Sequence, residues 1–184
     1  GESGLGFVAN QFLQGFSDVA AKPDDLSARQ VVLSRAGDLA SLFRSTAEQL
    51  TSLQSATKED VQNTVKSINE LATKIATVNA QLAGYQGAAH TPNDLLDRRD
   101  QLISELSKHV EVTRVEQDDG AMNLFIGGSQ SLVLGANAYK VEALDDATDP
   151  EKVRVAINVD GSQRELSADN LGGGALHGLI TFQD

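Results

Sequence analysis

The sequence predicts an α+β protein in which a bundle of long helices forms a stem and a small antiparallel β domain follows it. Residues 38–83 contain neither glycine nor proline, whereas nine glycines stand between residue 110 and the end of the chain. Because both residues interrupt regular helices, this change in density marks a boundary. The apolar spacing changes there too, from a helical period to a period of two. We therefore expect a helical stem domain over residues 1–109 and an antiparallel β domain over residues 110–184.

The composition limits the kind of protein that this chain can be. Its 184 residues suffice for one domain or two small ones. The net charge is −11, with 26 acidic and 15 basic residues and no basic cluster. Such a chain lacks the charge pattern that binds nucleic acid or an anionic membrane, so we expect neither as a partner. The absence of cysteine excludes disulfides and thiolate metal sites.

The chain carries no pattern for membrane insertion or for classical secretion. No apolar run reaches the roughly 18 residues that a membrane span needs. The first residues lack the charged and apolar regions of a signal peptide. If the protein is exported, it either uses a route without a cleaved signal or has lost its start. The abrupt stop at Asp184 indicates the edge of an expressed or processed piece.

Two helices are expected before residue 84. The first covers about residues 6–21 and carries apolar residues at helical spacing. Pro23 ends it, because proline cannot donate a backbone hydrogen bond and disfavours helix just before it. Asp24 or Asp25 can then cap a second helix over about residues 26–83, which would be roughly 85 Å long at 1.5 Å per residue.

The second helix carries the seam of a coiled coil. Its apolar residues recur at steps of three and four, the pattern by which one helix packs along another, and Asn79 fills one skipped position. A helix of this length cannot bury the stripe alone, so it must pack against helices of this chain or of neighbours. A break or bend near Gly37 or Thr57 is an alternative to one straight helix. The seam residues that we expect in an intrachain core, or alternatively at a partner surface, are Phe43, Leu71, Ile75, Val78 and Leu82.

A third helix is expected over about residues 92–109. Thr91 is the expected cap, Pro92 would take the first helical position, and Asp94 would lie near the positive helix end. Leu95 begins the apolar face of this helix.

The sharpest charged feature of the sequence lies on that third helix. It is the cluster Asp97, Arg98, Arg99 and Asp100. A catalytic carboxylate pair is a weak interpretation, because the neighbouring arginines would keep both acids ionised. We interpret the cluster as structural or as an intersubunit contact, and expect Asp97 and Arg99 to bridge to the long helix or to the β domain.

After residue 110, short alternating segments and tight turns predict antiparallel strands. We expect them at about residues 110–114, 124–126, 131–134, 139–143 and 153–159.

No motif predicts a metal, a cofactor or an enzyme. Ala147 and Pro150 occupy positions where a calcium loop would need a ligand and a glycine. The run at residues 172–174 indicates a turn rather than a phosphate cradle, because no Lys-Ser/Thr follows it. His90, His109 and His177 are not at metal-ligand spacing. We therefore expect no catalytic site and no bound cofactor.

Two helical segments resemble the flagellar hook-associated protein 1 family (FlgK). The early part of the long helix does so through Ala28, Arg29, Gln30, Leu33 and Phe43. The most specific match is the block NDLLDRRDQL at residues 93–102, where the family often has glutamine in place of Arg98. The resemblance is closer over residues 12–110 than over residues 111–184.

This resemblance implies a structural subunit at the hook–filament junction of the bacterial flagellum. It implies an extracellular protein, exported by the type III route without a cleaved signal peptide. The implied partners are copies of itself, the hook protein, the next hook-associated protein and an export chaperone that binds a terminal region. It also implies further helices beyond both ends of this chain.

Two other functional classes remain open from the residues alone. A coiled-coil surface adhesin or export-system tip protein with a β binding module could use the same seam and the same acidic surface. An enzyme would need convergent polar groups in a cleft, and the sequence offers no such set.

Overall fold

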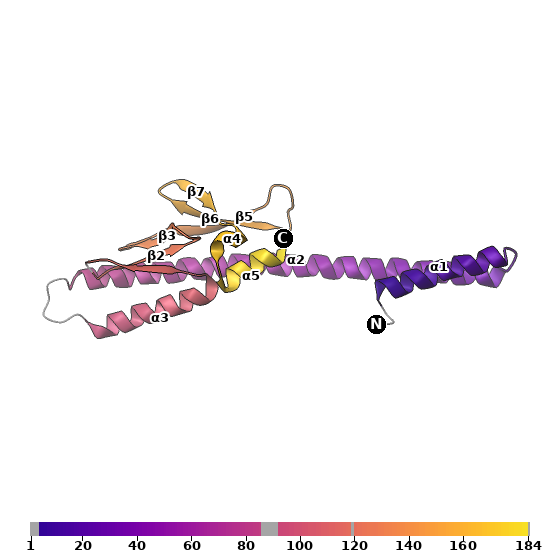
Figure 1. Ribbon diagram of the computed structural model, residues 1–184, viewed down its shortest axis with the longest axis horizontal. Coiled ribbons are helices and arrows are strands. Elements are labelled where there is room, and N and C mark those ends of the chain that lie inside the picture. Colours follow the sequence, from indigo (N-terminus) through magenta and orange to yellow (C-terminus); the bar gives the residue numbers. More distant parts are fainter. Residues whose placement is uncertain (1–3, 86–91, 119, 184) are drawn as a thin grey trace. The chain divides into compact units, whose positions relative to one another are not determined.

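The computed structural model describes residues 4–85, 92–118 and 120–183 (Figure 1). Its helices are α1 (Leu5–Ala21), α2 (Leu26–Ala83), α3 (Asn93–His109), α4 (Ala168–Leu171) and α5 (Gly174–Gln183). Its strands are β1 (Thr113–Glu116), β2 (Met122–Ile126), β3 (Gln130–Leu134), β4 (Asn137–Ala138), β5 (Lys140–Asp145), β6 (Val153–Val159) and β7 (Ser162–Glu165). Long helices followed by two small antiparallel sheets confirm the predicted α+β class.

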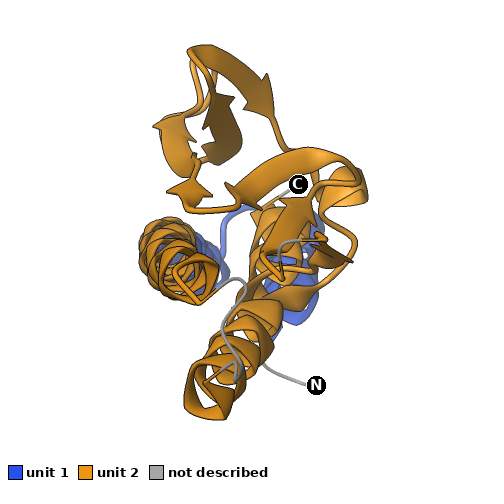
Figure 2. Ribbon diagram, turned by 90° about the vertical axis from the view of Figure 1, so that its left-hand side faces the viewer, with its two compact units in different colours: residues 1–53 blue, residues 54–184 orange. Residues whose placement is uncertain are grey.

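The chain divides into two compact units, residues 1–53 and residues 54–184, and the division falls inside α2 (Figure 2). This grouping by contacts differs from the expected division after residue 109, which remains a prediction about domains.

The long helix α2 is uninterrupted from Leu26 to Ala83, so the alternative of a break near Gly37 or Thr57 is wrong, while a bend there stays a prediction. Its start is capped by Asp25, whose Oδ1 accepts hydrogen bonds from the backbone N–H groups of Ser27 at 2.8 Å and Ala28 at 3.3 Å. Of the two candidate caps, Asp25 is therefore the one used, and it satisfies donors that the first helical turn leaves free.

Within the first unit, α1 packs on α2 at a close approach of the two backbones. A Cβ added to Gly15 would lie 3.0 Å from Cγ2 of Val32, so only glycine fits there without a shift. The Arg35 side chain donates from Nη1 to the carbonyl oxygen of Gln11 at 2.6 Å. These two contacts join α1 to the beginning of α2.

The second unit holds both sheets and the remaining helices. One sheet has the strand order β1-β2-β3-β4 and the other β5-β6-β7, and every pairing is antiparallel. In Figure 1 the strands lie beside the part of α2 that belongs to this unit. The core is aliphatic, and its fully buried members come from α2, α3 and its C-cap, the strands, α4 and α5. Its largest fully buried side chains are Val61, Ile68, Ile75, Ile103, Leu106, Val110, Leu124, Ile126, Leu132, Ile157, Leu171 and Leu176.

Several local expectations need correction. The strand expected from residue 110 begins only at Thr113, because Val110 is the C-cap of α3. Pro92 stands at the N-cap of α3 rather than at its first helical position. The expected cap Thr91 and the loop residue His90 lie outside the described residues.

The carboxyl-terminal part of the expected β domain is helical. Residues 168–171 and 174–183 form α4 and α5, which the alternating pattern did not predict. The glycines at 172 and 174 have positive φ angles, which supports the expected turn and places it between these two helices. Leu176 and Ile180, four residues apart, are both buried and fix α5 on the core.

Candidate interaction surface

The seam of α2 is buried in one unit and uncovered in the other. Within residues 54–83 its members are at most 7% exposed, including the polar Thr57 and Asn79. Within residues 36–53 the same spacing continues, but Phe43 is 53% exposed, Leu50 57% and Leu53 50%. We call the exposed Phe43, Leu50 and Leu53, together with the half-buried Leu39, the open seam.

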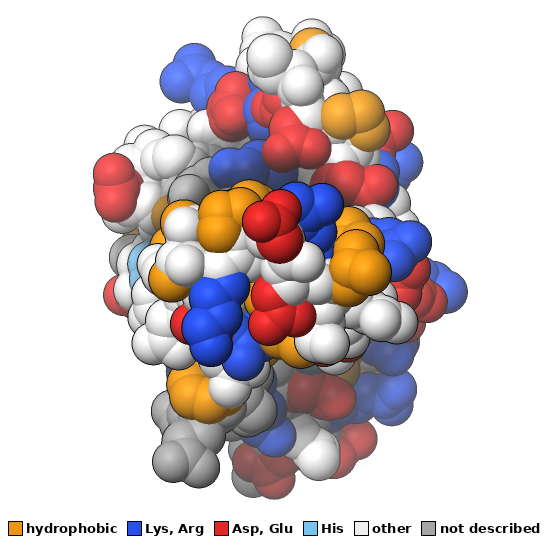
Figure 3. Space-filling model, turned by 90° about the vertical axis from the view of Figure 1, so that its right-hand side faces the viewer, with side chains coloured by type: hydrophobic (Ala, Val, Ile, Leu, Met, Phe, Trp, Pro, Cys, Tyr) orange, Lys and Arg blue, Asp and Glu red, His pale blue; other side chains and the backbone are white. Residues whose placement is uncertain are grey.

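The first unit has almost no core of its own. Among its described residues, 4–53, only Gly15 and Val32 are buried. Figure 3 shows hydrophobic side chains at the surface, lying among charged ones. The large apolar side chains of this unit that remain exposed are Leu5, Phe7, Leu13, Phe16, Leu26, Val31, Leu33, Phe43, Leu50 and Leu53. An apolar surface of this extent indicates an interaction site.

The structure separates the seam residues singled out in the sequence. Leu71, Ile75, Val78 and Leu82 are buried in the second unit, as expected for an intrachain core. Phe43 is exposed, and its role at an interface stays a prediction. Arg29 is exposed and donates from its guanidinium to the carbonyl oxygen of Pro23, at the turn before α2.

In the charged cluster of α3, Arg99 differs from its neighbours. It is 4% exposed, and its Nη1 donates to the carbonyl oxygen of Gly120 at 2.7 Å. Gly120 lies in the turn that joins β1 to β2, so Arg99 makes the bridge to the β strands that the sequence suggested. Its Nε is buried without a hydrogen-bond partner.

The other α3 candidates lie at or near the surface. Leu95 is half-buried, and Asp94, Asp97, Arg98 and Asp100 are exposed. Within the described ranges, Asp97 makes no bridge to α2 or to a strand, so that part of the expectation is wrong. A contact of these exposed residues with another subunit stays a prediction.

Sequence reasoning missed three amide side chains that hold strand backbones. Asn69 pairs with the backbone of Val141, and Gln183 pairs in the same way with Val153. Asn79 bonds to Met122 and also to the carbonyl oxygen of Gly135. Only Asn79 left a signal in the sequence, as a polar residue in an apolar seam.

The described part of the chain, residues 4–85, 92–118 and 120–183, contains no group of three or more His, Asp or Glu side chains able to hold a metal ion. None of the helices in these ranges has an apolar stretch sufficient to cross a lipid bilayer.

One loop carboxylate has a pKa that its surroundings lower. The backbone N–H of Thr148 donates to Asp146 at 2.7 Å and is the main cause, joined by the Thr148 hydroxyl, the Asp149 N–H at 3.1 Å and the positive charge of Arg154. These contacts favour the ionised carboxylate, so the pKa of Asp146 lies below its usual 3.8.

The lowered pKa predicts an acid-sensitive contribution of Asp146 to stability. A depressed pKa adds stability that is complete above the unfolded-state value and is lost as the pH falls through the folded-state value. We expect Asp146→Asn to destabilise the chain slightly at pH 6 and to have less effect toward pH 3. Urea unfolding of both chains across this range measures the difference. A difference that does not change with pH contradicts the prediction.

The fold and the open seam define a class of protein: a domain of long helices and small antiparallel sheets, with an apolar helix stripe exposed in its first unit. Comparison with known proteins gives the family. The family model described as the flagellar hook-associated protein FlgK helical domain matches residues 1–184. The chain belongs to the FlgK family of flagellar hook-associated proteins, which confirms the resemblance found in the sequence.

Individual relatives support the same family assignment. The chain is 33% identical over 184 residues to flagellar hook-associated protein 1 of Salmonella typhimurium, covering 98% of this chain and 33% of the relative. Against the protein of the same name from Bacillus subtilis, identity is 29% over 177 residues, covering 95% and 35%. The solved flagellar hook junction protein FlgK from Burkholderia pseudomallei superposes with a TM-score of 0.89 at 31% identity, covering 99% of this chain and 33% of that one. The chain thus spans about a third of the length of these relatives.

Proposed function

We propose that this chain is part of a structural subunit at the junction between the hook and the filament of a bacterial flagellum. Family membership and the likeness to a solved hook junction protein support this role. The observation that carries the mechanism is the open seam of α2, which continues the spacing of a seam that is buried elsewhere in the same helix. Helices outside this stretch of chain, or helices of neighbouring subunits, cover it by coiled-coil packing.

The proposed role includes a location and partners. The subunit acts outside the cell after type III export without a cleaved signal peptide. It assembles with copies of itself, with the hook protein and with the next hook-associated protein, and an export chaperone holds it beforehand. It acts as a scaffold and not as an enzyme. The alternative of an adhesin or tip protein is not favoured, because the family model and the relatives are flagellar.

Charged substitutions in the open seam test this proposal. Each Phe or Leu that becomes buried on assembly contributes roughly 1.5–3 kcal/mol, and a buried carboxylate costs more than that gain. We expect the protein with Phe43→Asp and Leu50→Asp to leave hooks without filaments. Both substitutions are made in the full-length protein, in the bacterium that encodes it, so that only the variant is expressed. Swimming is then measured, and electron microscopy shows whether the hooks carry filaments.

A matched control places the same two charges on the opposite side of α2. Ser41→Asp and Ser52→Asp alter exposed residues that lie about half a helical turn from the open seam. We expect this control to assemble filaments. The proposal fails if the seam variant, secreted in normal amounts, still builds normal filaments.

A further inference from the structure

Strand β5 has one free edge. It lies at the end of the β5-β6-β7 sheet, and among the strands of the described residues it pairs with β6 alone, over residues 140–145. Backbone groups along an antiparallel strand point alternately toward and away from the partner strand. The Val141 backbone bonds to a side chain outside the sheet, so it points away from β6. Ala143, two residues further on, therefore presents its N–H and C=O to the same outer side.

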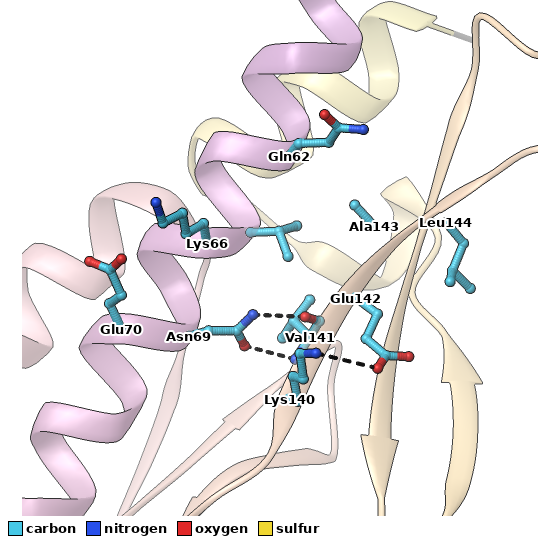
Figure 4. Close-up of a pocket in the computed structure, with 10 residues that line it drawn as sticks. Gln62, Lys66, Asn69, Glu70, Lys140, Val141, Glu142, Ala143 and Leu144 are labelled. Atoms are coloured by element: carbon cyan, nitrogen blue, oxygen red, sulfur yellow. Dashed lines mark hydrogen bonds and ion pairs between the residues drawn. The ribbon is translucent and has the colours of Figure 1, made fainter.

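The Asn69 side chain takes the place of a neighbouring strand at Val141. Its Nδ2 donates to the Val141 carbonyl oxygen at 2.8 Å, and its Oδ1 accepts from the Val141 N–H at 2.9 Å (Figure 4). An adjacent strand would make these same two hydrogen bonds with its own peptide groups. A second strand can therefore pair along this edge only if Asn69 leaves.

The same side of α2 also holds the far end of β5. Nζ of Lys58 donates to the carbonyl oxygen of Pro150 at 2.8 Å and forms an ion pair with Oδ1 of Asp145, also at 2.8 Å. Between Lys58 and Asn69, Gln62 and Ala143 line opposite sides of an open groove of about 540 Å³. Asn69 thus closes the edge at Val141, whereas Lys58 ties the far end of the strand to α2 through a carboxylate and a loop carbonyl. The outward backbone groups of Ala143, beside the groove, and of Asp145 make no hydrogen bond to α2 in the described residues.

We propose that Lys58 and Asn69 guard the β5 edge against pairing with the β5 strand of a second copy of this chain. An uncovered edge is a template for such pairing, and proteins cover their edges to prevent it. Two β5 strands can pair antiparallel about a two-fold axis, because the same edge serves both copies. Blocking this pairing is useful in a subunit that packs beside its own copies through other surfaces. The contacts of Lys58 and Asn69 lie within one chain, so their effect can be tested without the hook–filament role.

Removing the guard tests the proposal. We expect Lys58→Ala with Asn69→Ala to self-associate at least tenfold more strongly than the unsubstituted chain, measured by light scattering over a concentration series. Gln62→Ala with Lys66→Ala is the matched control, because both residues line the groove and neither bonds to β5. The control should associate like the parent chain.

A proline at position 143 separates edge pairing from unfolding. The Ala143 N–H points away from β6, so Ala143→Pro removes no bond inside the sheet but blocks a second strand. Added to the double variant, it should restore the association of the parent chain. Circular dichroism checks that each variant is folded, and the single Lys58→Ala variant, which keeps both Asn69 bonds, should show a smaller gain. The proposal is overturned if the folded double variant associates like its parent, or if proline at 143 leaves the gain unchanged.

Discussion

Replacing Gly174 with alanine is expected to destabilise the second unit by about 3 kcal/mol, since positive φ and backbone overlap each cost roughly 1–3 kcal/mol. Gly174 has a φ of +88°, a conformation that residues with a Cβ rarely adopt. An added Cβ would lie 2.7 Å from the Val110 backbone nitrogen and 2.8 Å from the His109 carbonyl carbon and oxygen. These are main-chain atoms at the end of α3, so no rotamer change relieves the contact. Urea unfolding followed by circular dichroism measures the loss.

Gly178→Ala is the matched control for this prediction. Gly178 lies in the same helix, has no positive φ, and its added Cβ would meet no atom within 4 Å. Alanine costs less conformational entropy than glycine in a helix, so we expect a gain of about 0.5–1 kcal/mol. The two glycines should therefore respond with opposite signs. Equal effects would show that the close approach at Gly174 does not constrain the fold.

The features predicted correctly from the sequence depend on interactions between residues that are close together in the chain. The expected bounds of α2, residues 26–83, are those of the structure, because a glycine- and proline-free segment with a three–four apolar spacing has few alternatives to helix. Capping by Asp24 or Asp25 was expected, because a short acidic side chain can accept from the free N–H groups of the first turn, and the structure shows that Asp25 does so. The same spacing predicted an apolar stripe that must be covered, and left open whether this chain or a partner covers Leu71, Ile75, Val78 and Leu82, which the structure buries within the chain.

What the sequence did not predict depends on contacts between distant residues. Helix α5 follows a glycine run and is short, so its pattern is ambiguous until Leu176 and Ile180 meet the core. The Asn69 pairing joins residues 72 apart and the Gln183 pairing residues 30 apart. An asparagine on a helix surface looks the same in the sequence whether it faces water or a strand edge. The difference between the covered and open parts of the α2 seam was also invisible, because their spacing is alike.

Replacing Asn79 with leucine is expected to destabilise the second unit by about 3 kcal/mol, because each buried backbone group that loses its partner costs roughly 1–3 kcal/mol. Asn79 is 1% exposed. Its Nδ2 donates to the carbonyl oxygens of Met122 at 2.9 Å and Gly135 at 2.8 Å, and its Oδ1 accepts from the Met122 N–H at 3.2 Å. Leucine has a similar size and offers none of these bonds.

The sign of this change distinguishes two accounts of the α2 seam. If the seam met only apolar side chains, as in a coiled coil, leucine at position 79 would fill the skipped position and stabilise the chain. Here the seam meets strand backbones, whose polar groups need a partner, so leucine should destabilise it. Asn63→Ala, at an exposed position of the same helix, should be neutral or slightly stabilising through helix propensity alone. Thermal and urea unfolding of the unsubstituted chain, Asn79→Leu and Asn63→Ala measure these differences in stability. A more stable Asn79→Leu chain would contradict the prediction and mean that packing outweighs the hydrogen bonds at this point of the core.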